Sequence, residues 1–348
     1  MDNLPLGAVA ALAGLLGGTV LGLASRLGDF CTLGALESAA FGADQRRLRL
    51  WGVVLGVAIL GTHLGAQAGW IDIGATYYHS LGWNPWGSVA GGLVFGYGMA
   101  MAGNCGFGAL VRFGGGDLRA MVVVLVMGIT GFVTLSGPLA PLRTALFAEG
   151  PPGGATSITR SLEAATGLAP MVTAGAIAAA LLVWALGSAA LRGSPRVILW
   201  GAAAGLSVVW CLAATSWLCA ASLGEVAVEG PSFTAPVGRT LLFLMTSTAG
   251  GISFSVGSVA GVMLGGLVGS LWRGLFRWEA CEDPRELGRQ VAGAALMGVG
   301  GIVAVGCSIG QGVTAFSTLA WSGPVTLGAI VLGGIAGLRQ LIGLAEPD

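Results

Sequence analysis

The chain has 348 residues, of which 55% are hydrophobic and only 9% are charged, and its formal net charge at pH 7 is zero. Soluble proteins carry charge on about a quarter of their residues, so this composition excludes an ordinary soluble fold and predicts an all-α polytopic membrane protein. The balanced charge argues against a nucleic-acid partner, because no basic surface is available for phosphate contacts. The 63 glycines have no Gly-x-y period, which excludes collagen, and they are typical of closely packed membrane helices.

Nine apolar segments follow one another along the chain, each close to the ~20 residues that a bilayer requires. They cover residues 7–25, 50–70, 87–104, 120–137, 168–191, 197–219, 251–272, 290–306 and 323–343. Two shorter, more polar stretches, at about 29–42 and 239–250, are too short to cross and are predicted to be short helices. The pattern therefore predicts about nine transmembrane helices in the lipid bilayer plus short re-entrant helices.

The arginines give these segments an orientation. All 16 basic residues are arginine. They cluster at 46–49, 192–196 and 273–289, whereas the loops at 71–86, 138–167 and 222–238 contain few. Because basic residues are enriched in cytoplasmic loops, we expect the clusters inside and these three loops outside. The N-terminus then lies on the outer, periplasmic side and the C-terminus in the cytoplasm.

The order of the segments occurs twice. Each half contains a span, a short piece, two spans, a Cys-bearing break and a span, and the extra span at 168–191 inverts the second copy. Arg26-x-x-x-Phe30 matches Arg239-x-x-x-Phe243. Inverted repeats of this kind are typical of transporters, although any chain of nine glycine-rich spans can be cut into similar halves. We expect a first transmembrane repeat (1–137), a linker loop with a connecting span (138–196) and an inverted second repeat (197–348).

Two Cys-x-x-Gly motifs interrupt the apolar segments. They are Gly103-Asn104-Cys105-Gly106-Phe107-Gly108 and Gly306-Cys307-Ser308-Ile309-Gly310. A broken helix exposes backbone N–H groups and a positive dipole end, which suit a small anion. Irregular backbone at membrane depth is tolerated only where protein or water satisfies it. The motifs therefore predict a permeation site, with close helix packing as the alternative explanation of their glycines.

The cysteine thiols indicate which class of anion the site would bind. A thiol is a weak, soft donor that suits a large sulfur-containing anion better than a strongly hydrated one. The six cysteines are Cys31, Cys105, Cys211, Cys219, Cys281 and Cys307. None forms Cys-x-x-Cys, so we expect no disulfide framework, metal site or cofactor. Cys211, Cys219 and Cys281 are interpreted as small hydrophobic residues.

Cys31 has no matching cysteine in the second half of the chain. Its register partner is Leu244, and the hydroxyls of Thr246, Ser247 and Thr248 nearby are candidate donors instead.

Polar neighbours complete the candidate site. Asn104 and Gln311 carry amides that could donate hydrogen bonds to an anion, and Arg112 could bind the anion or anchor its helix at the interface. His63 and His79 have no metal-ligand spacing and are interpreted as structural. The candidate substrate-binding residues are Cys31, Asn104, Cys105, Gly106, Gly108, Arg112, Cys307, Ser308, Gly310 and Gln311.

These motifs resemble the YeeE/YedE sulfur-transport family over most of the chain. The resemblance is carried by Phe30-Cys31-Thr32-Leu33-Gly34-Ala35, by the Cys105 motif with Arg112 and Gly114, and by the Cys307 motif. It implies a bacterial inner-membrane protein with an hourglass shape, inverted repeats and short re-entrant helices. It also implies uptake of thiosulfate along a narrow path on which three cysteines donate S–H hydrogen bonds in turn, and these roles match Cys105, Cys307 and Cys31.

The resemblance leaves the substrate open, because relatives include proteins linked to selenium metabolism and to sulfur oxidation. Many relatives work with a small cytoplasmic sulfur-carrier protein, which would be a separate partner here. We expect import of thiosulfate or a related small sulfur-containing anion without chemical change, and therefore no catalytic residue.

Three alternatives remain: a membrane sensor for a sulfur compound, a selenium-compound transporter, and a thiol enzyme. The enzyme is disfavoured because a reactive thiol needs a neighbour that lowers its pKa, and no histidine is near either motif in the sequence.

Overall fold

The structure is a computed structural model that describes residues 5–42, 44–148, 150, 156–247, 251–280 and 283–345. These residues form helices and three isolated bridges but no strand, which confirms the all-helical class. The first half contains α1 (Leu6–Gly28), α2 (Thr32–Ala40), α3 (Arg46–Gln67), α4 (Tyr77–Ser80), α5 (Pro85–Ala102), α6 (Gly106–Gly114) and α7 (Leu118–Leu135). The connection contains α8 (Ala140–Leu146), α9 (Ile158–Thr166), α10 (Pro170–Leu186) and α11 (Ala189–Arg192). The second half contains α12 (Pro195–Ala221), α13 (Ala235–Met245), α14 (Phe254–Trp272), α15 (Pro284–Val303), the π-helix η1 (Gly310–Ala315) and α16 (Ser322–Ala345).

Helices occupy all nine of the predicted segments, but not all are full spans. Over the described residues, seven helical stretches are long and apolar enough to cross a membrane, or eight if the pair α9 and α10 counts as one. The helix α10 has 17 residues and is therefore about 26 Å long, which is shorter than the ~30 Å thickness of the hydrocarbon core. It does not continue straight from α9, because the two helices meet at a bend of 115°. The helix α15 has 20 residues, but its first two turns carry Arg285, Glu286 and Arg289.

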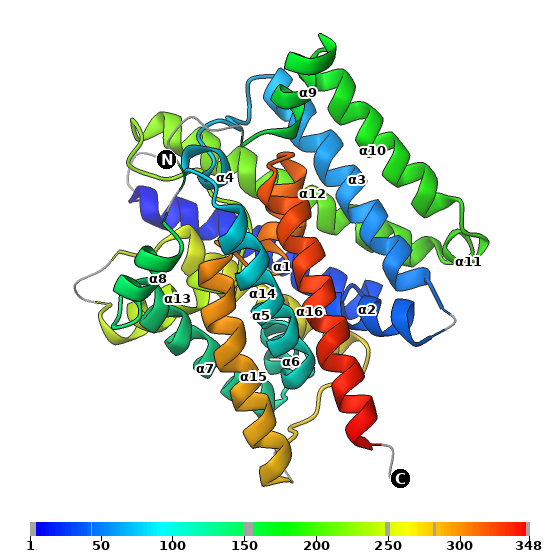
Figure 1. Ribbon diagram of the computed structural model, residues 1–348, viewed down its shortest axis with the longest axis vertical. Helices are drawn as coiled ribbons and strands as arrows, with labels where there is room; N and C mark the ends of the chain where they lie inside the picture. Colours follow the sequence, from blue (N-terminus) through cyan, green and yellow to red (C-terminus); the bar gives the residue numbers. More distant parts are fainter. Residues whose placement is uncertain are drawn as a thin grey trace.

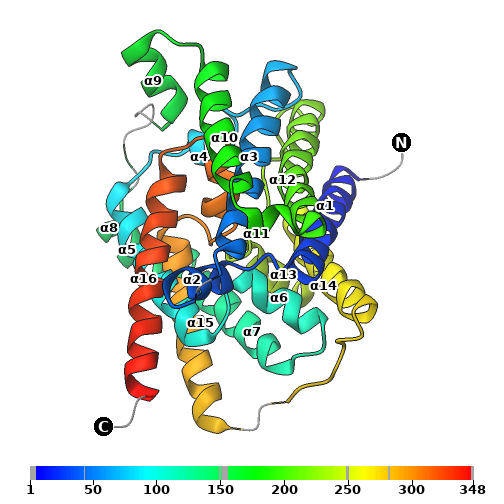
Figure 2. The same cartoon turned by 90° about the vertical axis from the view of Figure 1, so that its right-hand side faces the viewer.

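The long helices pack through glycines. The helices α1 and α14 lie side by side (Figure 2), and on each of them glycines spaced four residues apart face the backbone of the other helix. They are Gly14, Gly18 and Gly22 of α1 and Gly257, Gly261 and Gly265 of α14. A Cβ atom added to Gly18 would overlap the carbonyl oxygen of Ser258, and one added to Gly261 would overlap that of Leu15. Much of the high glycine content is therefore used for close approach of helix backbones, as is usual in membranes.

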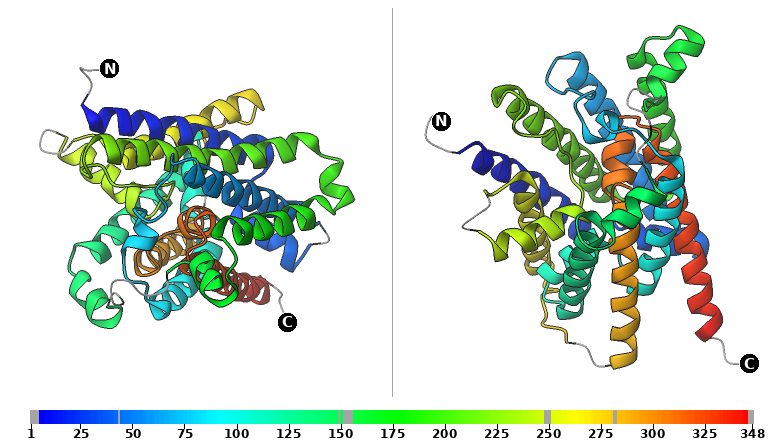
Figure 3. Two further views of the ribbon diagram at one scale, coloured as in Figure 1. Left: turned by 90° about the horizontal axis from the view of Figure 1, so that it is seen from above. Right: turned by 60° about the vertical axis from the view of Figure 1, so that its left-hand side comes forward.

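Two groups of helices are built around these contacts. In the first group, α1 contacts α12 and α14, and α3 lies between α10 and α12 (Figures 1 and 3). In the second group, α5 lies beside α15 and α16, and α15 also contacts α7 (Figure 1). The short helices α6 and α13 join the groups, since α6 packs on both α14 and α7 and α13 does the same.

Three of the connections between helices are breaks inside apolar stretches. The helices α1 and α2 form one 35-residue apolar stretch that is interrupted at residues 29–31, where Asp29 has a positive φ of 55°. The helices α5 and α6 form a 30-residue stretch that is interrupted at residues 103–105, where Gly103 has a φ of 74°. The third break lies between α15 and η1, where Val305 and Gly306 have φ values of 59° and 151°. The positive-φ residues Asp29, Gly103 and Val305 are exposed. The non-helical residues that follow them are buried, namely Phe30, Asn104, Cys105, Gly306 and Cys307.

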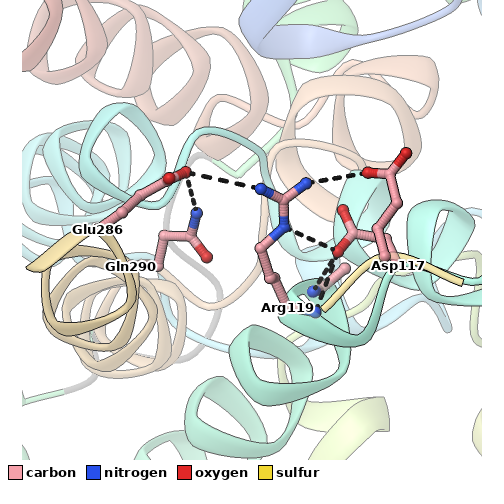
Figure 4. Close-up of polar contacts among 6 residues, drawn as sticks. Asp117, Arg119, Glu286 and Gln290 are labelled. Carbon is pink, nitrogen blue, oxygen red and sulfur yellow. Dashed lines mark hydrogen bonds and ion pairs between the residues drawn. The ribbon is translucent and has the colours of Figure 1, made fainter. Parts of the chain in front are cut away.

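An ion-pair cluster links α7 to the segment between α14 and α15 on the predicted cytoplasmic side of the protein (Figure 4). The guanidinium group of Arg119, at the start of α7, contacts Asp117 at 3.3 Å, Glu279 at 3.0 Å and Glu286 at 4.0 Å. The backbone N–H of Leu118 also donates to the carbonyl of Glu279 at 3.0 Å. The segment after α14 is thereby tied to α7 and to the first turn of α15.

We expect Arg119→Gln to lower the melting temperature modestly. The Arg119 side chain is 28% exposed, so the loss should be about 1 kcal/mol, or roughly 2–4 °C. The difference should shrink in 1 M salt, where the Debye length is about 3 Å. Thermal unfolding in detergent checks this, with Arg289→Gln as the control because Arg289 is exposed and makes no ion pair within the described residues. A loss that does not change with salt would contradict the ionic explanation.

Candidate functional site

Three cysteines have the same hydrogen-bond pattern at the three breaks. Cys31 is the N-cap of α2, Cys105 is the N-cap of α6, and Cys307 precedes η1. The sulfur of each accepts a hydrogen bond from the backbone N–H three residues later: from Gly34 at 3.5 Å, from Gly108 at 3.4 Å and from Gly310 at 3.4 Å. A thiol that accepts in this way still has its S–H hydrogen available for a ligand.

The Cys-x-x-Gly motif therefore occurs three times, once more than the two copies predicted to interrupt the apolar segments. The signal at Cys31-Thr32-Leu33-Gly34 was present in the sequence.

The residues that follow the cysteines bring the breaks together. The Thr32 hydroxyl lies 3.9 Å from the Cys105 sulfur and donates to the Ser308 hydroxyl at 3.3 Å. Thr32 follows Cys31, and Ser308 follows Cys307. Cys105 therefore lies beside Thr32 and Ser308, the residues that follow the other two cysteines. The three thiols thus surround one buried centre, with Cys105 between Cys31 and Cys307.

The centre is closed to solvent. Cys105 and Cys307 are each 1% exposed and Ser308 is fully buried, whereas Cys31 is half-buried. A chain of buried aromatic rings lies along it: Phe30 stacks between Trp51 and Phe107, at centroid distances of 5.1 and 6.3 Å, and Phe107 contacts Phe233 at 5.4 Å. Thiols and hydroxyls within an apolar surround form a narrow, weakly polar site of the kind that suits a soft ion.

Cys307 is connected to an outer cavity. Its sulfur accepts a hydrogen bond from the backbone N–H of Phe233 at 3.3 Å and lies 3.9 Å from the Ser232 hydroxyl. Ser232 lines a cavity of about 160 Å³, as do Tyr78 and Gln311. The lining comes from residues 76–88, 135–147 and 228–239, together with part of 301–322. The first three of these ranges belong to the loops that arginine content places outside.

The mouth of this cavity carries charge. Arg239 pairs with Glu229 at 3.0 Å. Arg143 also lines the cavity, and within the described residues it makes no ion pair and its Nε atom has no hydrogen-bond partner. Arg143 is therefore a cation in the cavity wall that no carboxylate of the described residues neutralises.

The two predicted amide donors have different surroundings. The Gln311 amide nitrogen donates to the backbone carbonyls of Ala304 and Val305, at 2.9 and 3.0 Å. The break after α15 leaves these carbonyls without helical partners, so Gln311 holds the break and does not offer its donors to an anion. Asn104 is 5% exposed, and its side-chain oxygen has no partner.

The remaining predicted residues separate into two groups. Gly310 lies in the site, since a Cβ atom there would come within 2.6 Å of the Ser232 hydroxyl and 3.2 Å of the Tyr78 hydroxyl. Gly106 serves helix packing, because its Cβ would meet the Met127 side chain at 2.6 Å. Arg112 lies in the last turn of α6 and is exposed, at the opposite end of that helix from Cys105.

The expected register between the two halves is wrong. Arg26 lies in the last turn of α1, before a break, whereas Arg239 lies inside α13. Leu244, expected opposite Cys31, is 69% exposed.

Near Leu244, Thr246 and Ser247 are also exposed, and Thr248 lies outside the described residues. The N-cap of α13 is Thr234, which follows the buried Phe233 as Cys31 follows the buried Phe30. Thr234 therefore holds at the start of α13 the N-cap position that Cys31 holds at the start of α2.

The other cysteines lie away from the centre. Cys211 is fully buried in α12 and packs against Gly17, in agreement with its interpretation as a small hydrophobic residue. Cys219 is half-buried near the end of α12. Cys281 lies outside the described residues.

Comparison with known proteins points to one family. The family described as Sulphur transport matches residues 27–336, a range that contains all three breaks. The thiosulfate transporter TsuA of Escherichia coli (strain K12) is 25% identical over 332 residues, covering 92% of this chain and 92% of that protein. The thiosulfate transporter TsuA of Spirochaeta thermophila is 25% identical over 327 residues, covering 89% of this chain and 92% of that protein.

Proposed function

Because this chain belongs to the Sulphur transport family, we propose that it imports thiosulfate or a related small sulfur-containing anion across the bacterial inner membrane without changing it chemically. The observation that carries the proposal is the meeting of three cysteine-capped helix breaks at one buried centre. The names of its two relatives, both thiosulfate transporters, support this choice of substrate.

The proposed path begins at the outer cavity and ends in the cytoplasm. The anion passes the Ser232 hydroxyl to reach Cys307, then Cys105 beside Thr32, and then Cys31. At each step one S–H group and the N-terminal end of a short helix stabilise the negative charge. Each site is weak because a thiol is a poor donor, and weak sites in series allow an ion both to enter and to leave.

We also propose that the two halves form an inverted repeat, residues 1–137 and 197–348, joined by residues 138–196. Contacts between helices support this. The pair α1 and α14 has a counterpart in α12 and α3, and the pair α5 and α16 has one in α15 and α7. In the same way α13 packs on α7, and α2 packs on α16. A pseudo-symmetric pair of bundles with breaks between them is a transporter architecture.

The proposed orientation places the outer cavity in the periplasm, with the N-terminus periplasmic and the C-terminus cytoplasmic. The half-buried Cys31 then lies nearest the cytoplasm, with Arg47, which packs against Gly34 of the same motif, and Arg112 in its vicinity. These cations would receive the anion as it leaves the thiols. A separate small sulfur-carrier protein is the partner we propose for the released sulfur compound.

Uptake into proteoliposomes tests the proposed function. We expect the purified wild-type protein to accumulate labelled thiosulfate, and excess unlabelled thiosulfate to compete far better than sulfate. Saturable binding without accumulation would favour a sensor. Accumulation that selenium oxyanions block more strongly than thiosulfate would favour a selenium-compound transporter.

We expect Arg143→Gln to raise the KM for thiosulfate roughly threefold with little change in maximal rate. Arg143 is the unpaired cation at the outer cavity, and a charge at an opening acts chiefly on the rate of encounter. The effect should fade as ionic strength rises. Initial uptake rates at low and high salt check this, with Arg196→Gln at the other end of the molecule as the control. An unchanged KM at low salt would remove Arg143 from the entry path.

A further inference from the structure

A second cavity lies away from the cysteine path. Its volume is about 430 Å³, and it lies between the outer end of α3, the loop with α4, and the bend between α9 and α10. None of its lining residues lines the outer cavity of the cysteine path. The polar lining residues are His63, Gln67, His79, Thr156, Ser157, Thr159 and Arg160. Its volume falls in the range of small-molecule sites, about 300–1,000 Å³.

The charges of this cavity favour an anionic group. Arg160 contributes a guanidinium group, which makes no ion pair within the described residues. Among the described residues that line the cavity, none is an aspartate or a glutamate. Burial lowers the pKa of His79 to about 4, so His79 is neutral at physiological pH. Arg160 is therefore the one formal charge among the lining residues, and a negative group is the ligand that it would attract.

His63 offers a hydrogen-bond acceptor to the cavity. His63 is 6% exposed, and its Nδ1 atom lies 3.0 Å from the Ile59 carbonyl, which can only accept. Nδ1 therefore carries the proton, and the Nε2 atom of the neutral ring is an acceptor. Nε2 has no hydrogen-bond partner among the described residues although the residue lines the cavity. Nε2 is not among the atoms sealed from solvent, so this acceptor faces the cavity, where a ligand can supply an O–H or N–H group to it.

The walls are held in place by contacts to the segment that follows η1. The backbone N–H of Ile158 donates to Leu319 at 2.8 Å, and that of Trp321 donates to Thr156 at 2.9 Å. His79 contacts the Thr318 hydroxyl at 3.2 Å. The cavity therefore has a fixed frame and is not merely a gap between loops, and such preorganisation favours binding.

From these observations we infer that this cavity is a second binding site, which takes an anionic group with a neighbouring hydroxyl from the outer side of the membrane. Arg160 binds the negative charge, and His63 Nε2 accepts the hydroxyl proton in a hydrogen bond. A soluble phosphate ester such as glycerol phosphate and the head group of phosphatidylglycerol both carry this chemistry. The inference does not depend on the substrate of the cysteine path.

Titration of the protein in nanodiscs tests the site. The Cys105→Ala/Cys307→Ala double variant serves as background, so that anion binding at the central thiols does not contribute. In nanodiscs of phosphatidylcholine alone, glycerol phosphate should bind with one site per chain, and neutral glycerol should not. Arg160→Gln should weaken binding roughly tenfold, because a charge-assisted hydrogen bond is lost. Arg192→Gln, an exposed arginine near the opposite end of α10, should leave it unchanged.

Nanodiscs that contain phosphatidylglycerol separate the two sources. If the lipid is the ligand, these nanodiscs should abolish glycerol phosphate binding and raise the melting temperature of the background variant, but not of its Arg160→Gln derivative. If a soluble anion is the ligand, both lipid compositions should give the same affinity. Absence of glycerol phosphate binding together with no effect of phosphatidylglycerol would overturn the inference. Binding that Arg160→Gln leaves intact would overturn it as well.

Discussion

We expect the initial rate of thiosulfate uptake to fall roughly tenfold or more when either Cys105 or Cys307 is replaced by alanine. Each replacement removes an S–H donor from a buried site, and a hydrogen bond to a charged group contributes about 1.5–3 kcal/mol. It also removes the sulfur that accepts from Gly108 or Gly310 and so leaves a buried N–H unsatisfied. Initial uptake rates in proteoliposomes, normalised to reconstituted protein, measure the effect.

Two further variants separate the role of the thiol in transport from its role in folding. Cys105→Ser keeps an N-cap acceptor at the start of α6, so the fold should be preserved. A hydroxyl is a harder and stronger donor than a thiol, so this variant should lose thiosulfate flux and discriminate less against sulfate. Cys219→Ala, which removes a thiol outside the path, should transport normally. Normal uptake by both alanine variants would refute the proposed path.

The second large effect is expected at the contact between α1 and α14. Gly261→Leu should lower the melting temperature by roughly 5–10 °C and reduce the yield of monodisperse protein. The new Cβ atom would overlap the Leu15 carbonyl and lie 2.9 Å from the Thr19 nitrogen. Overpacking costs about 1–3 kcal/mol where side chains can shift, and here the obstacle is backbone, so we expect the upper end of that range.

A glycine on another helix supplies the matched control. Gly175 lies within α10, and a Cβ atom there has no heavy atom within 4 Å. Gly175→Leu should therefore leave the melting temperature within a few degrees of the wild type. If Gly261→Leu and Gly175→Leu change the melting temperature by the same amount, the glycines between α1 and α14 are not required for close approach of the two backbones.

Local features of the fold could be predicted from sequence because they depend on neighbouring residues. The apolar segments predicted helices where the structure has them, and the two Cys-x-x-Gly motifs coincide with helix breaks. By length and hydropathy, α10 alone and α15 fall outside the seven helical stretches of the described residues that could cross a membrane. For α10 the reason is the bend of 115° from α9, and for α15 it is the charged first turns.

The arrangement of side chains in the site could not be predicted in the same way. The role of Gln311 depends on two carbonyls that lose their helical partners where Val305 has a positive φ. The contact of Thr32 with Ser308 joins residues from opposite halves of the chain. Long-range pairs of this kind depend on how the helices pack, and no local pattern reports them. The third Cys-x-x-Gly motif, by contrast, could have been found, because Cys31 and Gly34 show the same spacing as the other two pairs.

The second cavity shows the same limit. His63 and His79 lack metal-ligand spacing, so their sequence positions predict structural residues. Folding brings them and Arg160 to one cavity, although Arg160 belongs to the connecting region. This arrangement depends on how the bend between α9 and α10 packs against α3 and the loop with α4, and nothing in the sequence of one helix alone indicates it.

The most direct test of the central claim is uptake of thiosulfate that is labelled separately at its two sulfur atoms. Import along the thiols without chemical change predicts that the inner and outer sulfur labels accumulate in proteoliposomes at the same rate and in equal amounts. Both rates should fall together in Cys105→Ala and Cys307→Ala. Accumulation of only one label, or transfer of the outer sulfur to the protein as a persulfide, would show that a bond is broken on the way and would contradict the account.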